Sequence, residues 1–299
     1  MSNASPLRGA LAALAGTILI WAYSWVVMKQ ALAYAGPFDF AALRYLLGAG
    51  VLFGAQVVSR QSLRPPPLLP TALIGLCQTA AFQGLGQWAL VGGGAGHVAL
   101  LAYSMPFWAV LLAWPLLGER PSGRHVLGLV LAAAGLLCIL EPWHGLGSPL
   151  STVLALAGGI GWAGGTVLSK RLFQRHEVSA LSLTAWQMLI GALALGVVAL
   201  LVPQRPIVWN GRFVGALIYS AVMASSVAWG LWLVVLKRLP TTVASLSSLG
   251  VPVVSVLLAW LILGERPGMA EGVGIVLVLL GLAAVTGALK WPGKVRRAA

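Results

Sequence analysis

Side chains that can hydrogen-bond a ligand recur along one apolar segment of the chain. Thr79, Gln83 and Gln87 stand four residues apart, so they share one face of a helix, and Gln78 lies beside that face. Amides and hydroxyls are costly against lipid, so this face should contact protein or a water-filled cavity. The pattern favours the lining of a cavity, with hydrogen bonding between helices as the alternative.

Tryptophan side chains form a second set of candidate ligand contacts. Trp21 and Trp25 share one helical face, and Trp162 corresponds to Trp21 because WAYSWVVMK at 21–29 resembles WAGGTVLSK at 162–170. These rings lie deep in apolar runs and either line a pocket for an apolar or aromatic group or pack as ordinary core. Three other tryptophans fit the usual position at the membrane interface: Trp143, Trp209 and Trp291.

Isolated polar groups occur in two further apolar runs. His97 and Tyr103 belong to one run, and His97 either titrates in a cavity or caps a helix at the interface. Ser245 and Ser248 precede Pro252 in a later run, where the missing proline donor frees a backbone carbonyl upstream. That weak point could act as a hinge or bind a polar group, and a packed kink is the alternative.

One arginine stands inside an apolar run. Arg44 is about five residues into its run, roughly 7 Å deep at the rise of a helix. It either binds a carboxylate or extends its stem so that the guanidinium reaches the interface. The second interpretation is favoured at this shallow depth.

The residues needed for catalysis or a metal site are missing from the sequence. All six acidic residues lie near the ends of apolar runs, and Cys77 and Cys138 have no metal-binding spacing. We find neither a nucleophile triad nor a GxxxxGK[ST] phosphate loop. We therefore expect no enzyme activity, no metal and no cofactor. A membrane sensor or assembly factor is a third class, but it would not need a duplicated helical bundle.

The composition places the chain in a lipid bilayer. Of its 299 residues, 59% are hydrophobic and 8% are charged, against about 25% charged in soluble domains. Ten apolar runs are long enough for, or close to, the length of a membrane span, and helices are the structure that fits them. They are Leu11–Ala33, Phe40–Val58, Leu69–Val91, Gly96–Leu117, Val126–Leu140, Leu150–Leu172, Ala180–Val202, Phe213–Leu236, Val243–Leu263 and Gly272–Lys290.

The basic residues between these runs predict the orientation. Fourteen Lys and Arg lie in the breaks on the side of the N-terminus, and four lie on the opposite side. Because positive residues accumulate on the cytoplasmic side, both termini should be cytoplasmic. The net charge of +13 therefore reflects membrane orientation and not nucleic-acid binding.

The motif LGERP occurs twice, at 117–121 and at 263–267. Similar apolar stretches surround both copies, so the chain consists of two related halves, 1–145 and 146–299. Each half holds five predicted spans, and an odd number inserts the halves with opposite orientation. Within the motif, Gly can stop a helix in the left-handed conformation and Pro prevents its continuation, while Glu and Arg can pair.

This combination resembles the EamA-type members of the drug/metabolite transporter (DMT) superfamily, and within it the YddG-type exporters of aromatic and other amino acids. The resemblance implies an all-α membrane protein in which two inverted five-helix repeats surround a central cavity. It also implies the export of amino acids from a bacterial cytoplasm across the inner membrane, by a monomer whose partners are the substrate and the bilayer.

The polar and aromatic residues above are the candidate contacts for such a substrate. They are Trp21, Trp25, Thr79, Gln83, Gln87, His97, Tyr103, Trp162, Ser245 and Ser248. Because no carboxylate lies at mid-span, we expect facilitated diffusion by alternating access. Proton antiport of another small metabolite or drug is the alternative.

Overall fold

The computed structural model describes residues 4–93, 95–140, 148–254 and 268–286, and every regular element in these ranges is a helix. Two helices precede the first broken one: α1 (Ala4–Ala31) and α2 (Pro37–Val58). The next segment runs continuously through α3 (Leu68–Ile74), a wider π-helical stretch η1 (Gly75–Ala81) and α4 (Phe82–Gly92). The helices α5 (Ala95–Ala102), α6 (Met105–Leu117) and α7 (Gly123–Leu140) follow.

The second part of the chain repeats this order of elements. It begins with α8 (Pro149–Arg175) and α9 (Ala180–Leu201). A continuous segment then combines α10 (Gly211–Tyr219), the π-helical stretch η3 (Ser220–Val227) and α11 (Ala228–Arg238), and α12 (Thr241–Ser247) and α14 (Met269–Thr286) come last.

Six of the described helical segments are long and apolar enough to cross a membrane. They are Gly9–Ala31, Pro37–Val58, Leu68–Gly92, Pro149–Arg175, Ala180–Leu201 and Gly211–Arg238. Shorter apolar helices overlap the other four predicted runs. Large apolar side chains remain exposed on the outer surface, for example Leu200 at 88% and Leu69 at 72%, as expected for a surface that faces lipid.

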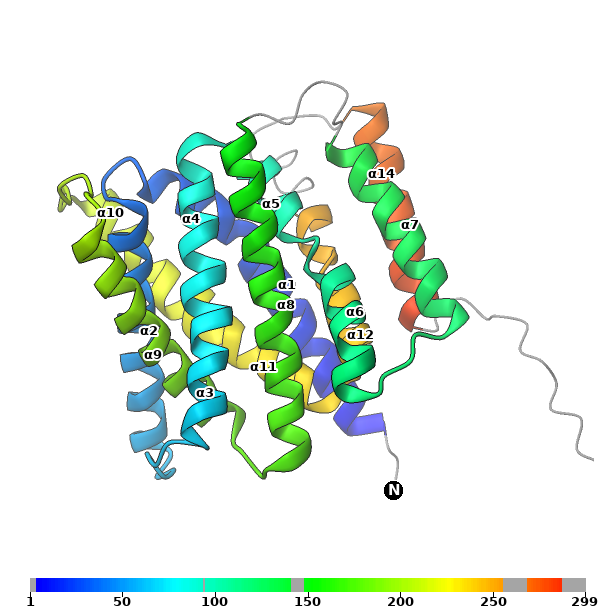
Figure 1. Ribbon diagram of the computed structural model, residues 1–299, viewed down its shortest axis with the longest axis horizontal. Coiled ribbons are helices and arrows are strands. Elements are labelled where there is room, and N and C mark those ends of the chain that lie inside the picture. The colour runs from blue at the N-terminus through cyan, green and yellow to red at the C-terminus, as the bar shows by residue number, and fades with distance from the viewer. Residues whose placement is uncertain (1–3, 94, 141–147, 255–267, 287–299) are drawn as a thin grey trace, which may run out of the picture.

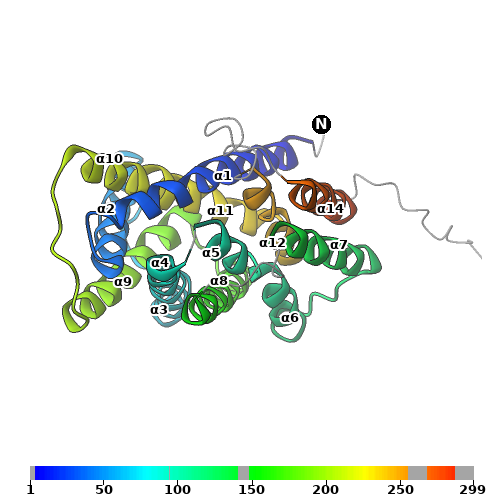
Figure 2. The ribbon, with the colours of Figure 1, turned by 90° about the horizontal axis from the view of Figure 1, so that it is seen from above.

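The helices pack in pairs that join the two parts of the chain. Helix α1 packs on α11, α4 on α8, α2 on α9, and α6 on α12. Helices α7 and α14 pack on each other at one edge of the bundle, away from α2, α9 and α10 at the opposite edge (Figures 1 and 2). Gly135 permits this contact, since a Cβ there would lie 2.7 Å from the carbonyl oxygen of Gly274.

Irregular turns occur at corresponding places in both parts. The π-helical stretches η1 and η3 each lie in the middle of a long helical segment. Within η3 the side-chain hydroxyl of Ser226 donates to the carbonyl of Ala221 at 2.7 Å. Helical geometry is also interrupted at 103–104 and at 248–249. Pro106 stands in the first turn of the new helix α6, where its missing donor costs no hydrogen bond.

The first LGERP motif ends α6 and contacts the start of another helix. Gly118 takes the left-handed conformation at φ 69°, as its sequence position predicts. The carboxylate of Glu119 accepts hydrogen bonds from the backbone N–H groups of Thr241 and Thr242, at 3.3 and 3.4 Å, and so caps α12. The expected pairing of Glu with Arg is thus replaced by a helix cap. The second motif, 263–267, lies outside the described residues.

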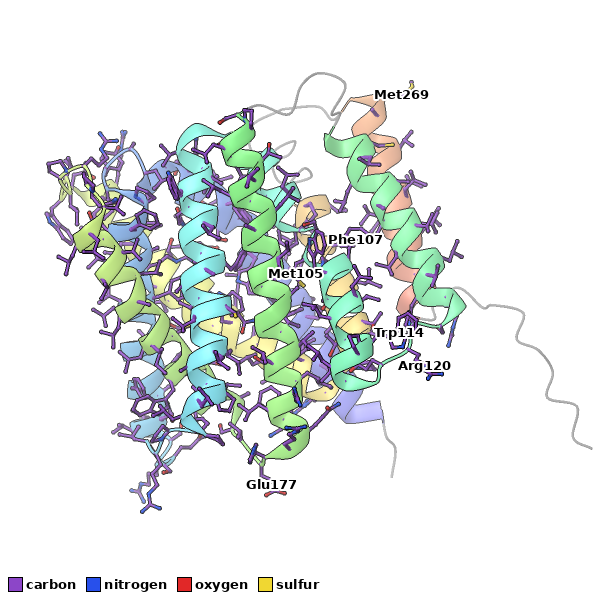
Figure 3. All side chains as sticks on the ribbon, viewed as in Figure 1. Met105, Phe107, Trp114, Arg120, Glu177 and Met269 are labelled. Atoms are coloured by element: carbon purple, nitrogen blue, oxygen red, sulfur yellow. The ribbon has the colours of Figure 1, made fainter. Side chains whose placement is uncertain are left out.

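Figure 3 shows how the side chains lie relative to the ends of the bundle. Glu177 lies at the lower end in this view, just past the end of α8, Arg120 projects outward beyond the end of α6, and Met269 lies at the upper end (Figure 3). The start of α1 lies toward the same end as Glu177.

Candidate functional site

A small cavity lies at the middle of the bundle, between helices from both parts of the chain. Its volume of about 20 Å³ is room for about one water molecule, so no substrate fits in this conformation. Helices α1, α2, α4, α8 and α11 and the turn between α5 and α6 supply its walls. The lining residues are Trp21, Ser24, Trp25, Met28, Arg44, Phe82, Gln83, Tyr103, Trp162 and Trp229.

Aromatic rings fill most of the space around this cavity, and Trp162 is at their centre. Its ring stacks on Phe82, with centroids 4.7 Å apart, and meets Trp21 and Tyr103 edge-on at 5.4 Å each. Trp21 also packs edge-on against Trp229 at 5.0 Å. Each such pair stabilises the fold by about 0.5–1.5 kcal/mol beyond the effect of its buried area, so the cluster stabilises this packed conformation.

Glycines around Trp162 allow its helix to approach the neighbouring backbones. A Cβ at Gly159 would lie 3.0 Å from the carbonyl oxygen of Ala102, and one at Gly161 would lie 3.0 Å from that of Cys77. Helix α8 therefore contacts both η1 and the end of α5 closely, and this places the indole of Trp162 between them.

Arg44 is buried in the wall of the cavity with 2% of its surface exposed. Its Nε donates to Ser225 Oγ at 3.0 Å and its Nη1 donates to Met28 Sδ at 2.7 Å. The guanidinium carbon also lies 4.9 Å from the centroid of the Tyr45 ring. The expectation that this side chain reaches toward the interface is therefore wrong, because helices α1 and α10–η3 cover it.

A hydrogen-bonded group of side chains packs beside Arg44 and helps to position it. The indole of Trp229 donates to Tyr45 Oη at 3.1 Å, and Ser225 lies within hydrogen-bonding reach of the same phenol. Trp21 is fixed separately, since its Nε1 donates to the carbonyl of Ala224 at 3.1 Å. The wide turn η3 thus supplies both Ala224 and Ser225 to the site.

Five of the ten sequence-predicted site residues come together at this cavity. They are Trp21, Trp25, Gln83, Tyr103 and Trp162. The backbone of His97 belongs to α5, but its side chain lies outside the described residues.

Thr79 points elsewhere, which corrects its predicted position on one face with Gln83. Its hydroxyl donates to Gln187 Oε1 on α9 at 3.1 Å. The sequence pattern assumed a regular α-helix, whereas the wider turns of η1 change the direction of the residues that it contains.

Gln87, Ser245 and Ser248 are buried but do not belong to the lining of the central cavity. The amide of Gln87 and the hydroxyl of Ser245 have no hydrogen-bond partner within the described part of the chain. Ser248 donates to the carbonyl of Ser245 at 2.7 Å and so stabilises the interrupted helix. These residues form the polar interior of the bundle and not the cavity wall.

The candidate contacts predicted from the sequence omit five lining residues, although carboxylate binding was one of the two interpretations of Arg44. Ser24 and Met28 follow Trp21 and Trp25 on the same helical face, so the 3.6-residue period could have identified them. Phe82, Trp229 and Arg44 come from other segments, and their proximity depends on packing between helices that no local pattern encodes.

The profile of the EamA-like transporter family matches this chain twice, over residues 7–141 and 150–287. The chain belongs to the EamA-like transporter family. It is therefore a multi-pass membrane transport protein, and the central cavity is the candidate site at which this EamA transporter meets its substrate.

Curated relatives cover most of the chain at low identity. The chain is 30% identical over 282 residues to a "Probable amino-acid metabolite efflux pump" of Salmonella typhimurium, covering 89% of this chain and 90% of the relative. It is 28% identical over 291 residues to the protein of the same description in Escherichia coli, covering 92% and 93%. The "Uncharacterized transporter YoaV" of Bacillus subtilis is 26% identical over 270 residues, covering 88% and 92%.

A solved crystal structure has the same fold as this EamA transporter. The two superpose with a TM-score of 0.78 at 24% sequence identity, covering 95% of this chain and 97% of the other. At that identity the likeness concerns the fold alone.

The cavity of this EamA transporter offers groups for binding. Among the side chains that the structure describes, its lining combines aromatic faces with an amide, a phenol, a hydroxyl and one guanidinium, and includes no carboxylate, imidazole or thiol. Among the described residues, no three His, Cys, Asp or Glu side chains gather as they would around a metal ion.

Proposed function

We propose that this EamA transporter exports amino acids, aromatic and other apolar ones among them, from the bacterial cytoplasm by facilitated diffusion. The observation that carries the proposal is the small cavity in the middle of the bundle, where aromatic rings pack around Trp162. An apolar or aromatic side chain that enters between these rings would replace ring–ring contacts with similar ones. The free energy lost when the rings separate would therefore be recovered when the substrate binds.

The transport cycle that we propose uses ten spans in two halves, 1–145 and 146–299, inserted in opposite directions. The double match to the family profile supports this arrangement, as do the corresponding wide turns η1 and η3 and the breaks at 103–104 and 248–249. Rocking of one half against the other would open the cavity to one side at a time.

The exit path that we propose lies on the side of the bundle opposite the start of α1. A wider, open cavity of about 560 Å³ lies where α1, α4 and α9 end, beside Lys29, Trp88 and Arg205. Phe38 and Trp88 both line this vestibule and pack edge-on, with centroids 5.8 Å apart. With both termini in the cytoplasm of a bacterium, as the Lys and Arg distribution predicts, the vestibule faces outward.

The relatives described as amino-acid metabolite efflux pumps support both the substrate class and the direction. The aromatic walls favour the YddG-type preference for aromatic amino acids over a preference for small polar ones. We propose that the monomer transports, because the cavity is built within a single chain.

The test is flux of labelled L-phenylalanine through the purified protein in liposomes, with equal pH on both sides and the membrane potential clamped at zero. We expect labelled substrate to equilibrate across the bilayer and to stop there. Empty liposomes and a Trp162→Ala protein provide the controls. Flux no greater than in empty liposomes, for phenylalanine and for a panel of other amino acids, would refute amino-acid export.

A further inference from the structure

Arg44 carries a positive charge in the interior of the protein, and no carboxylate is described near it. Aromatic rings lie beside it: the guanidinium carbon is 4.9 Å from the centroid of the Tyr45 ring and 6.0 Å from that of the Phe40 ring. An unpaired ion inside a protein costs several kcal/mol, and such residues inside a membrane protein line substrate or ion pathways.

The groups that contact Arg44 leave most of its hydrogen-bonding capacity free. A guanidinium has five N–H donors, and the hydrogen bonds described for it use Nε and one from Nη1. One acceptor is a hydroxyl and the other a thioether, which is a weak acceptor. The contacts position the guanidinium at the cavity wall without neutralising it.

A purely structural role does not account for this arrangement. The helices that carry Ser225 and Met28 could be held together by packing alone. A neutral side chain of similar length at position 44 would fill the same space without the cost of a buried charge. A second polar group at the same cavity is also unpartnered, because Trp162 is 1% exposed and its Nε1 has no described hydrogen-bond acceptor. Both groups are donors, so the occupant of this cavity must supply acceptor oxygens.

We propose that Arg44 binds the carboxylate of the transported molecule, with the indole N–H of Trp162 as an additional donor. The inference rests on the proposed function for the identity of the cargo as an amino acid. A planar guanidinium binds the two oxygens of a carboxylate in parallel, which selects acids over amides and amines. The ring faces of Trp21 and Trp229 then receive the ammonium group or the side chain of the amino acid.

The experiment compares four molecules of one shape that differ in their charged groups. They are L-phenylalanine, L-phenylalaninamide, 2-phenylethylamine and 3-phenylpropionate. Binding to the purified full chain is measured as the rise in its unfolding temperature with ligand concentration, and flux of labelled phenylalanine is measured separately in liposomes. The variants are Arg44→Gln and Arg44→Lys, with Arg212→Gln as a matched control because Arg212 lines an outer cavity and is exposed.

For the wild type we expect the acids to bind at least about tenfold more tightly than the amide and the amine, as one charge-assisted hydrogen bond or more would give. Arg44→Gln should remove this preference, Arg44→Lys should retain part of it, and Arg212→Gln should leave it unchanged. Equal binding of acid and amide by the wild type would overturn the proposal, and this measurement remains decisive if Arg44→Gln does not fold.

The same data separate this proposal from the proposed function. Transport of phenylalanine with an acid-to-amide preference that survives in Arg44→Gln would refute the role of Arg44 and leave amino-acid export standing. Absence of amino-acid flux, with Arg44-dependent binding of 3-phenylpropionate, would refute amino-acid export and leave the carboxylate site standing.

Discussion

Lys29 and Lys170 make the same contact in different parts of the chain. The ammonium of Lys29, near the end of α1, donates to the carbonyls of Leu90 and Gly93 at 2.6 and 2.9 Å. That of Lys170, near the end of α8, donates to the carbonyls of Leu236 and Leu239 at 3.0 and 2.7 Å. Each lysine thus binds the last carbonyls of a helix, where the helix dipole favours a positive charge.

Removing this contact should destabilise the protein. We expect Lys170→Met to lower the free energy of unfolding by about 2 kcal/mol, because carbonyls at the end of α11 lose a charged donor. The apparent unfolding temperature in detergent measures the effect, and Arg175→Met at the exposed end of α8 is the control. Equal unfolding temperatures for the two variants would show that the contact contributes nothing.

The aromatic cluster should control transport more than the exposed rings do. We expect Trp162→Ala or Trp21→Ala to lower flux at least about tenfold, as for central contacts of other binding sites. Gln83 and His97 were predicted to belong to the same group, and their alanine variants test that prediction. Trp209, which is 63% exposed, is the control and should change flux by less than about twofold.

Substituting Trp162 by Phe separates binding from folding in this test. It preserves an aromatic contact with Phe82 and should retain more flux than Ala at equal expression. If Trp209→Ala were the more damaging change, the central cavity would not be the transport site.

Transport should not require a proton gradient. The described carboxylates closest to the bundle interior are at helix ends: Asp39 stands in the first turn of α2 and Glu119 caps α12. A carrier driven by protons needs a group whose protonation changes the balance between its states. Accumulation of substrate above equilibrium under an imposed pH gradient, abolished by a protonophore, would contradict facilitated diffusion and make His97 the first residue to substitute.

Both termini should be protected in intact cells. The excess of Lys and Arg in the breaks on the N-terminal side is the basis for this prediction. Tags fused to either end should resist protease added outside and become sensitive once the membrane is opened. Cleavage of both tags in sealed cells would show that the orientation is reversed, and cleavage of one tag alone would show that the number of spans is odd.

The contact between α7 and α14 should tolerate no larger residue at its glycine. A Cβ at Gly135 would meet both Gly274 O and Val278 Cγ2 at 2.7 Å, so Gly135→Val forces the helices apart at a cost of about 1–3 kcal/mol. Gly196 has open space around it and also lies within a helix, so Gly196→Val is the control. A similar unfolding temperature for both variants would indicate that α7 and α14 do not pack closely.

The length and composition of the apolar runs were enough to predict an all-helical chain, and helical periodicity predicted part of the site. Trp21 and Trp25 share a face in any regular helix, and the internal repeat connected Trp21 to Trp162, which lie 5.4 Å apart between ring centroids. The same reasoning failed for Thr79, because nothing in the sequence marks the wide turns of η1. It also failed for Arg44, whose burial depends on Ser225 and Met28, residues brought to it only by the packing of other helices.

The cavity of about 20 Å³ in the middle of the bundle is too small for a continuous column of water. With rings packed around Trp162, an idle protein in this conformation would conduct few protons or salt ions, and the membrane potential would survive many copies in the bilayer. A cell could therefore keep such an exit for metabolites permanently in its membrane without dissipating its ion gradients. Each opening would be coupled to the passage of a molecule large enough to part the rings.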